Sequence, residues 1–152
     1  RTPDKLERAK ALGLDAGVVA EAGKFADAVK RIGAPAVVLE LVGGGYVDED
    51  LRCIATRGRI VLVGLMAGAR SELDLGLLLR KRIRVTGTVL RSRPLEEKLA
   101  AMRVFEEQVV PLVARGKLVP VIDTVMPLAE AAAAHARMAS NVGFGKIVLR
   151  VE

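Results

Sequence analysis

Strand-sized apolar segments separated by helical segments constrain the fold of this chain more than any other feature. Two continuous apolar runs lie at residues 36–41 and 59–64, and an alternating run lies at residues 83–89. A continuous run such as residues 59–64 is typical of a strand that is buried on both faces. Strands that alternate with helices form parallel βαβ units. The sequence therefore predicts an α/β fold in which helices flank both faces of a parallel sheet.

The remaining elements follow from hydrophobic spacing and from helix-ending residues. A fourth strand of the parallel sheet is expected at residues 16–19. Helices are expected at residues 3–12, 24–32, 46–55, 75–81, 95–112 and 128–138, and further strands at residues 118–125 and 146–151. Pro111 should kink the long helix, because proline cannot donate the backbone hydrogen bond that a helix interior requires.

Composition excludes several classes of protein. The chain has 152 residues, of which 51% are hydrophobic and 28% charged, so a folded domain is expected rather than a disordered chain. Aromatic residues make up only 3%, which argues against a surface that stacks bases or sugars. No apolar run approaches the roughly 18 residues of a membrane span, and the start shows no signal-peptide pattern. We expect a cytoplasmic protein whose single cysteine, Cys53, is buried and inert.

The net charge of +6 raises the question of a polyanionic partner. Most of the basic residues are scattered among acidic ones, and only Arg80, Lys81, Arg82 and Arg84 form a dense cluster. A nucleic acid is therefore the less favoured partner.

Two glycine-containing loops follow predicted strands. They are Gly43-Gly44-Gly45 and Gly64-Leu65-Met66-Ala67-Gly68, and neither matches the common phosphate-binding motifs. In an open α/β sheet, ligands bind at the edge where the strands end, and both loops should lie there. The alternative is that each loop is only a turn that needs positive φ angles. That alternative is favoured for either loop alone, but two loops after successive strands strengthen the ligand hypothesis.

Residues with catalytic or metal-binding chemistry are sparse. His135 is the only histidine, and its place on the apolar face of a helix favours a structural role. One histidine and one cysteine do not make a metal site, so neither a metal ligand nor a catalytic residue is predicted. Lys5 lies in the first turn of a predicted helix, where it could either neutralise a phosphate group or belong to a solvated helix face.

The order and spacing of several segments resemble the medium-chain dehydrogenase/reductase superfamily, and within it the zinc-free quinone oxidoreductases. These segments are Leu39–Gly44, Gly58–Gly68, Leu90–Arg93, Leu118–Asp123, Pro127–Leu128 with Ala134-His135, and Gly145–Leu149. The resemblance covers nearly all of the chain, but only the C-terminal half of such an enzyme. It therefore also explains why the chain opens on a helix rather than on a strand.

The resemblance implies a partial Rossmann-type, doubly wound parallel sheet that lacks its first strand. Residues 1–115 would be the remainder of the dinucleotide-binding domain. Residues 116–152 would be the C-terminal return segment of the substrate domain, which is GroES-like in this family. The implied homodimer forms through the strand at Ile83–Val89, an edge open to pairing.

The resemblance also implies which residues contact the cofactor, NADPH. Lys5 would contact its 2′-phosphate, and residues 42–44 its adenosine side. Residues 64–66 would hold the nicotinamide amide, residues 90–92 would lie over the nicotinamide end, and Lys146 would lie near the cofactor. By name these residues are Lys5, Val42, Gly43, Gly44, Gly64, Leu65, Met66, Leu90, Arg91, Ser92 and Lys146. The sequence departs from the family pattern at Ala20, where many relatives have a tyrosine, and at Glu40, where aspartate is common.

The implied reaction is hydride transfer from NADPH to a quinone or an α,β-unsaturated carbonyl. This half of the enzyme need not supply a catalytic residue or a metal, and alone it is expected to be inactive. An enoyl or alkenal reductase of the same superfamily is the alternative within enzymes. A non-catalytic dimerising or polyanion-binding module is the alternative from another class.

Overall fold

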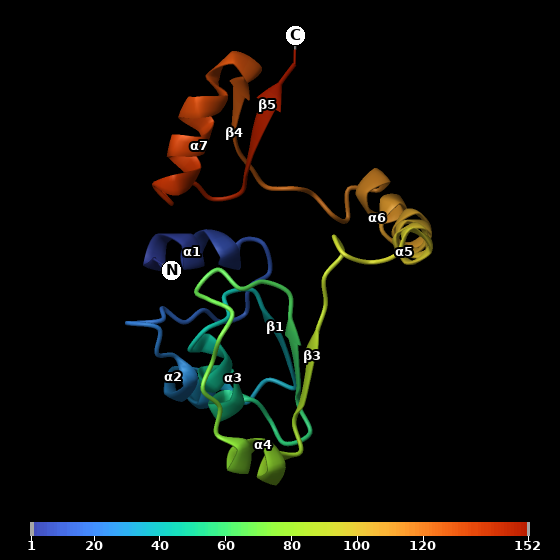
Figure 1. Cartoon of the computed structure of the whole chain (residues 1–152). Helices are drawn as coiled ribbons and strands as arrows, with labels where there is room; N and C mark the ends of the chain where they lie inside the picture. The colour runs from blue at the N-terminus through green and yellow to red at the C-terminus, as the bar shows by residue number, and fades with distance from the viewer. Residues whose placement is uncertain (1, 152) are drawn as a thin grey trace. The chain divides into compact units, whose positions relative to one another are not determined.

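A computed structural model describes residues 2–151, and residues 1 and 152 lie outside the described part. The chain divides into two compact units, residues 1–92 and residues 93–152 (Figure 1). The sequence boundary expected at residues 115 and 116 refers to the domains of a longer enzyme, and it stays a prediction. None of the helices within residues 2–151 is long and apolar enough to cross a membrane.

The first unit contains a three-stranded parallel sheet in the order β1-β2-β3. Its elements are α1 (Pro3–Lys10), α2 (Ala26–Ile32), β1 (Val37–Glu40), α3 (Tyr46–Cys53), β2 (Arg59–Leu62), α4 (Leu75–Lys81) and β3 (Arg84–Gly87). The strands expected at residues 36–41, 59–64 and 83–89 are confirmed, as is their parallel direction. Each is a few residues shorter than expected, because pairing ends where the loops diverge.

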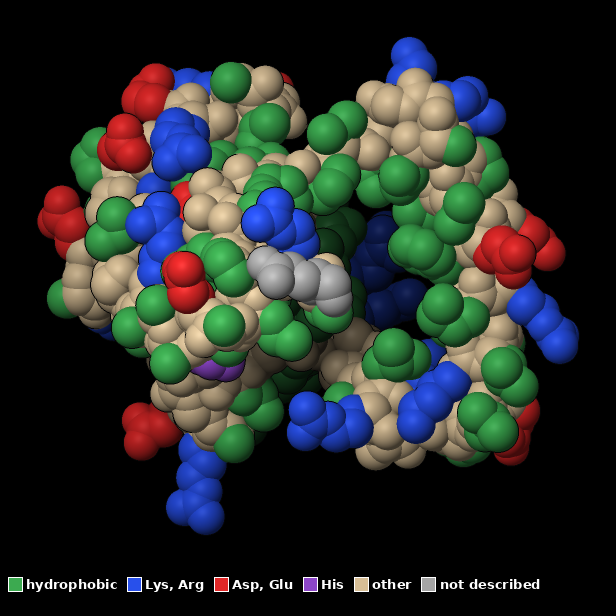
Figure 2. Space-filling view, turned by 90° about the horizontal axis from the view of Figure 1, so that it is seen from above, with side chains coloured by type: hydrophobic (Ala, Val, Ile, Leu, Met, Phe, Trp, Pro, Cys, Tyr) green, Lys and Arg blue, Asp and Glu red, His purple; other side chains and the backbone are tan. Residues whose placement is uncertain are grey.

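The core of this unit lies on one face of the sheet. Leu51 of α3 and Ile54, which directly follows that helix, pack on Ile60 and Ile83, and all four side chains are buried. On the opposite face Leu39 is 68% exposed, and other hydrophobic side chains are also exposed there. Figure 2 shows hydrophobic side chains spread over the molecular surface. Within this unit, the expected cover of helices on both faces is therefore met on one face only.

The strand expected at residues 16–19 is wrong. These residues form no strand, and the isolated bridge that the described residues show nearby joins Glu21 to Lys24. A strand needs a neighbour that accepts and donates its backbone hydrogen bonds. Among the described residues, no backbone hydrogen bond joins residues 16–19 to β1. Apolar character alone was not enough to make this segment a strand.

The second unit pairs two parallel strands beneath a helix. It contains α5 (Leu95–Gln108), α6 (Val110–Ala114), β4 (Ile122–Pro127), the 3₁₀ helix η1 (Leu128–Glu130), α7 (Ala131–Ala139) and β5 (Lys146–Arg150). The long helix expected over residues 95–112 is interrupted at Val109, and Pro111 lies in the first turn of α6. Proline is tolerated there because a first-turn N–H has no partner within the helix.

Candidate functional site

Two loops meet at the carboxyl edge of the three-stranded sheet. The first glycine loop, residues 41–45, follows β1, and the second glycine loop, residues 63–68, follows β2. The N–H of Ala67 donates to the carbonyl of Val42 at 2.7 Å, and the N–H of Gly44 donates to the carbonyl of Gly68 at 3.1 Å. The expected juxtaposition of the two loops is confirmed.

Glycine is required in these loops for two physical reasons. Gly43 and Gly44 have φ angles of 73° and 55°, a region that side chains disfavour. A Cβ atom on Gly64 would lie 2.5 Å from the carbonyl oxygen of Leu41, so the two loops pack without room for a side chain. The explanation that these glycines serve a tight turn is therefore confirmed. Their role toward a ligand stays a prediction.

Glu40 holds the first glycine loop from beneath. Its Oε1 atom accepts hydrogen bonds from the N–H groups of Val42 and of Gly43, the latter at 2.6 Å. The N–H of Gly44 is also engaged, by Gly68. These three N–H groups are therefore not available to a ligand. In this respect the loop differs from a phosphate-binding glycine loop, whose N–H groups bind the phosphate.

Asp50 of α3 is buried against Glu40 and is only 3% exposed. Burial raises the pKa of Asp50 to about 8, and a hydrogen bond to Glu40 and the charges of Glu40 and Glu49 add to the shift. At neutral pH the Asp50 carboxyl therefore holds a proton. Its Oδ2 atom has no hydrogen-bond partner within the described residues.

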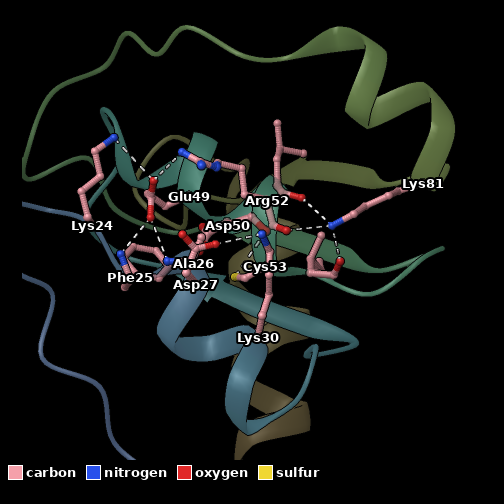
Figure 3. A network of polar contacts seen from close by, with 12 residues as sticks. Lys24, Phe25, Ala26, Asp27, Lys30, Glu49, Asp50, Arg52, Cys53 and Lys81 are labelled. Atoms are coloured by element: carbon pink, nitrogen blue, oxygen red, sulfur yellow. Dashed lines mark hydrogen bonds and ion pairs between the residues drawn. The ribbon is translucent and has the colours of Figure 1, made fainter.

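Glu49, the neighbour of Asp50, is buried in the opposite charge state. Its Oε2 atom accepts from the N–H groups of Phe25 and Ala26, both at 2.8 Å (Figure 3). Burial alone would raise the pKa of Glu49, but these hydrogen bonds and the charges of Lys24 and Arg52 lower it overall. The ionised carboxylate thus fixes the start of α2 against α3.

Sequence reasoning missed both buried acids of α3, because aspartate and glutamate on helices are mostly solvated. A signal was present for Asp50. It lies three residues after Val47 and four before Ile54, both buried, so helical spacing places it on the apolar face. Cys53, three residues beyond Asp50, is a free buried thiol as expected.

The second glycine loop does present free donors. Among the described residues, no hydrogen bond engages the backbone N–H groups of Leu65 and Met66, and Met66 is 72% exposed. Beside this loop lies a cavity of about 480 Å³ between the ends of β2 and β3. Its lining is mostly apolar and comprises Leu62, Val63, Gly64, Leu65, Gly87, Thr88 and Val89.

The other residues implied by the resemblance lie outside the two glycine loops. Lys5 lies in the first turn of α1, which Figure 1 shows at the carboxyl end of the three-stranded sheet. Residues 90–92 follow β3 beyond the cavity, and Leu90 is exposed. Lys146 begins β5 in the second unit, so its predicted role is not tested. Within residues 2–151, no three or more His, Cys, Asp or Glu side chains are grouped to hold a metal ion.

Comparisons with known proteins place this site in a family. A family model described as zinc-binding dehydrogenase matches residues 12–149. The chain is 35% identical over 115 residues, 74% of its length, to a quinone oxidoreductase of Pseudomonas aeruginosa, of which it covers 34%. It is 26% identical over 145 residues, 95% of its length, to an acryloyl-coenzyme A reductase of Sulfurisphaera tokodaii, of which it covers 40%.

Solved structures agree. The quinone oxidoreductase from Thermus thermophilus, solved alone and in complex with NADPH, matches with a TM-score of 0.81 and 31% identity. That match covers 99% of this chain and 47% of the other. The chain spans less than half the length of the curated relatives it matches. Because the family model extends over most of its residues, the chain belongs to the zinc-binding dehydrogenase family.

Proposed function

We propose that this chain is the cofactor-binding portion of an NADPH-dependent oxidoreductase that reduces a quinone or an α,β-unsaturated carbonyl. The observation that carries the proposal is the meeting of the two glycine loops at the carboxyl edge of the sheet, beside an apolar cavity. Ligands of open α/β sheets bind at this edge. The Thermus thermophilus relative, solved in complex with NADPH, supports the choice of cofactor.

The residues at this edge suit a nicotinamide. The free N–H groups of Leu65 and Met66 could donate to the carboxamide, while the apolar cavity excludes water from one side of the ring. The bound nicotinamide would supply the hydride, and the protein would supply binding and orientation. Lys5 would pair with the 2′-phosphate, which NADH lacks. Residues 90–92 and Lys146 remain proposed contacts.

Reduction of an enoyl thioester is a second candidate. The acryloyl-coenzyme A reductase matches over 95% of this chain. Both reactions use the same cofactor edge, so this chain's own residues do not separate them. A comparison of quinone and enoyl-thioester reduction by a longer polypeptide that contains this chain would choose between them.

Cofactor binding is tested in a longer polypeptide that contains this chain, by titrating NADPH and NADH and following the cofactor's own fluorescence. The variant is Lys5→Ala, and the matched control is Lys10→Ala. The control removes the same charge from the other end of α1, where Lys10 pairs with Glu7. Losing one charge-assisted contact costs roughly 1.5–3 kcal/mol, or about tenfold to a hundredfold in affinity. Lys5→Ala should weaken the binding of NADPH by that factor and leave the affinity for NADH nearly unchanged.

Three outcomes would count against the proposal. The first is that Lys5→Ala lowers the affinities for NADPH and NADH equally. The second is that Lys10→Ala lowers the affinity for NADPH as much as Lys5→Ala does. The third is that neither cofactor binds. The 152 residues alone should not turn over a quinone, because they lack a diphosphate-binding glycine loop. Turnover by this chain in a quinone reduction assay would contradict that part of the proposal.

A further inference from the structure

Two Arg-x-Arg segments lie side by side at the amino edge of the three-stranded sheet. Arg57-Gly58-Arg59 leads into β2, and Arg82-Ile83-Arg84 leads into β3. Arg59 and Arg84 occupy directly opposed positions in the parallel pairing. Side chains at paired positions project from the same face of a sheet, so these two arginines are neighbours. They lie at the opposite end of the strands from the glycine loops.

The first arginine of each segment adopts a left-handed backbone. Arg57 has a φ of 62° and Arg82 a φ of 53°, where glycine or asparagine is usual. Hydrogen bonds hold both turns. The N–H of Arg57 donates to the carbonyl of Lys81 at 2.7 Å, and the N–H of Ile83 donates to that of Leu78 at 3.2 Å. The turn arginines Arg57 and Arg82 line the same cavity as the strand arginines.

The four arginines line one cavity of about 510 Å³, and no other residue among residues 2–151 lines it. Within the described residues, none of the four guanidinium groups forms a hydrogen bond or an ion pair. Some arginines elsewhere in the described part of the chain form ion pairs, as Arg52 does with Glu49, and others, such as Arg103, do not. The four arginines of the pocket differ from the others in lining one cavity together. Like charges at opposed strand positions are destabilising. The fold therefore gathers four positive charges without supplying their counter-ion.

We propose that this tetra-arginine pocket binds a small anion with at least two linked phosphate groups. A guanidinium presents a planar fork of donors that pairs with two oxygens of one phosphate. Four such groups around one cavity supply a positive charge comparable to the negative charge of a diphosphate, whose terminal oxygens can accept from several guanidinium groups at once. The site is separate from the proposed cofactor edge, and the inference does not depend on the proposed function.

A small ligand is favoured over a nucleic acid by the lining. In the described part of the chain no aromatic side chain borders the pocket, so it offers no platform for a base. The four charges converge on one cavity, whereas a nucleic-acid site usually presents a stripe of charges that follows the sugar-phosphate backbone. A nucleic acid remains a measurable outcome of the test.

The test is calorimetric titration of the 152-residue chain with inorganic pyrophosphate at two salt concentrations. Arg59→Gln/Arg84→Gln removes the two strand arginines. Arg57→Gly/Arg82→Gly removes the two turn arginines and favours the left-handed backbone, so it should not impair folding. The matched control, Arg103→Gln/Arg115→Gln, removes two exposed charges from the second unit. Circular dichroism verifies the fold of each variant.

Saturable binding of pyrophosphate is expected, at least tenfold weaker in both pocket variants and less than twofold weaker in the control. Inorganic phosphate should bind more weakly than pyrophosphate. The proposal is overturned if the unmodified chain shows no saturable binding, or if all three variants lose affinity equally. It is also overturned if a DNA duplex binds more tightly than pyrophosphate and the pocket variants lose that binding.

Discussion

Two neighbouring acids of α3, Glu49 and Asp50, differ in charge although both are buried. Glu49 is ionised because two backbone N–H groups and two cations surround it. Asp50 has no such donors and faces Glu40, so it holds its proton near neutral pH. Glu40 in turn accepts the two N–H groups that shape the loop. Glu40 therefore interacts both with Asp50 and with the first glycine loop.

This link predicts that Asp50 makes the stability of the fold depend on pH. The pKa of Asp50 is raised from 3.8 to about 8, so the folded state binds a proton that the unfolded state loses. Its contribution is fully present below pH 3.8, declines as pH rises, and is lost above pH 8. The slope is at most about 1.4 kcal/mol per pH unit for one proton.

Asp50→Asn should flatten this decline, because the amide stays neutral and can still donate to Glu40. Relative to the unmodified chain, the variant should gain stability as pH rises from 5 toward 8. Urea unfolding followed by circular dichroism at several pH values measures the difference. The control is Asp27→Asn, which replaces an exposed aspartate of α2. Its free energy of unfolding should change with pH in the same way as that of the unmodified chain. Parallel curves for Asp50→Asn as well would show that the Asp50 carboxyl is not protonated in the fold.

At the residue scale, the sequence allowed the glycines to be predicted but not their acidic support. Gly43 and Gly64 follow apolar strands, and a positive φ or close packing leaves glycine as the residue that fits. The raised pKa of Asp50 comes first from burial and then from Glu40, which is ten positions away in the sequence. Such a pairing becomes visible only once α3 is packed on β1.

At the scale of elements, Lys81 joins two helices that are distant in sequence. Its Nζ atom donates to the carbonyls of Leu51, Arg52 and Ile54 at 2.9, 3.0 and 2.7 Å (Figure 3). Carbonyl groups at the end of a helix have no partner within it and carry partial negative charge. The last residue of α4 therefore caps the end of α3.

Lys81→Met should lower the free energy of unfolding by about 2 kcal/mol, because the apolar stem remains while a charged donor to three carbonyls, two of them in part-buried contacts, is lost. Thermal and urea unfolding followed by circular dichroism measure the loss. The control is Lys30→Met, which removes an amine that pairs with Asp27 on the surface of α2 and should cost far less. Equal losses for the two variants would mean that the cap contributes no more than a surface ion pair.

The elements that were predicted correctly are those with a partner inside the chain. β1, β2 and β3 pair with one another, and α4 has the predicted bounds. The strand expected at residues 16–19 has no neighbour within the described residues and does not form. Proline fixed the break between α5 and α6 through its missing N–H, a local effect that sequence does reveal.

At the scale of the whole molecule, the three-stranded sheet has surfaces that it does not cover itself. Leu39 and further hydrophobic side chains on one sheet face are exposed, and β3 is an edge strand. The curated relatives are more than twice as long as the part that this chain matches. The family resemblance implied pairing of two chains through Ile83–Val89, and that implication stays a prediction.

The direction of the backbone groups on β3 gives this prediction a sharp test. The N–H groups of Arg84 and Thr88 donate toward β2, to the carbonyls of Gly58 and Leu62 at 3.0 and 2.9 Å. Because donors alternate along a strand, the N–H of Val85 points away from β2 and toward the open edge. Val85→Pro should remove that outward donor while leaving the pairing of β3 with β2 intact, since proline is tolerated on edge strands. Sedimentation velocity should show a dimer for the unmodified chain and for Val85→Thr, which keeps the donor, but a folded monomer for Val85→Pro. A monomer in all three, or a dimer that survives Val85→Pro, would rule out strand pairing at this edge.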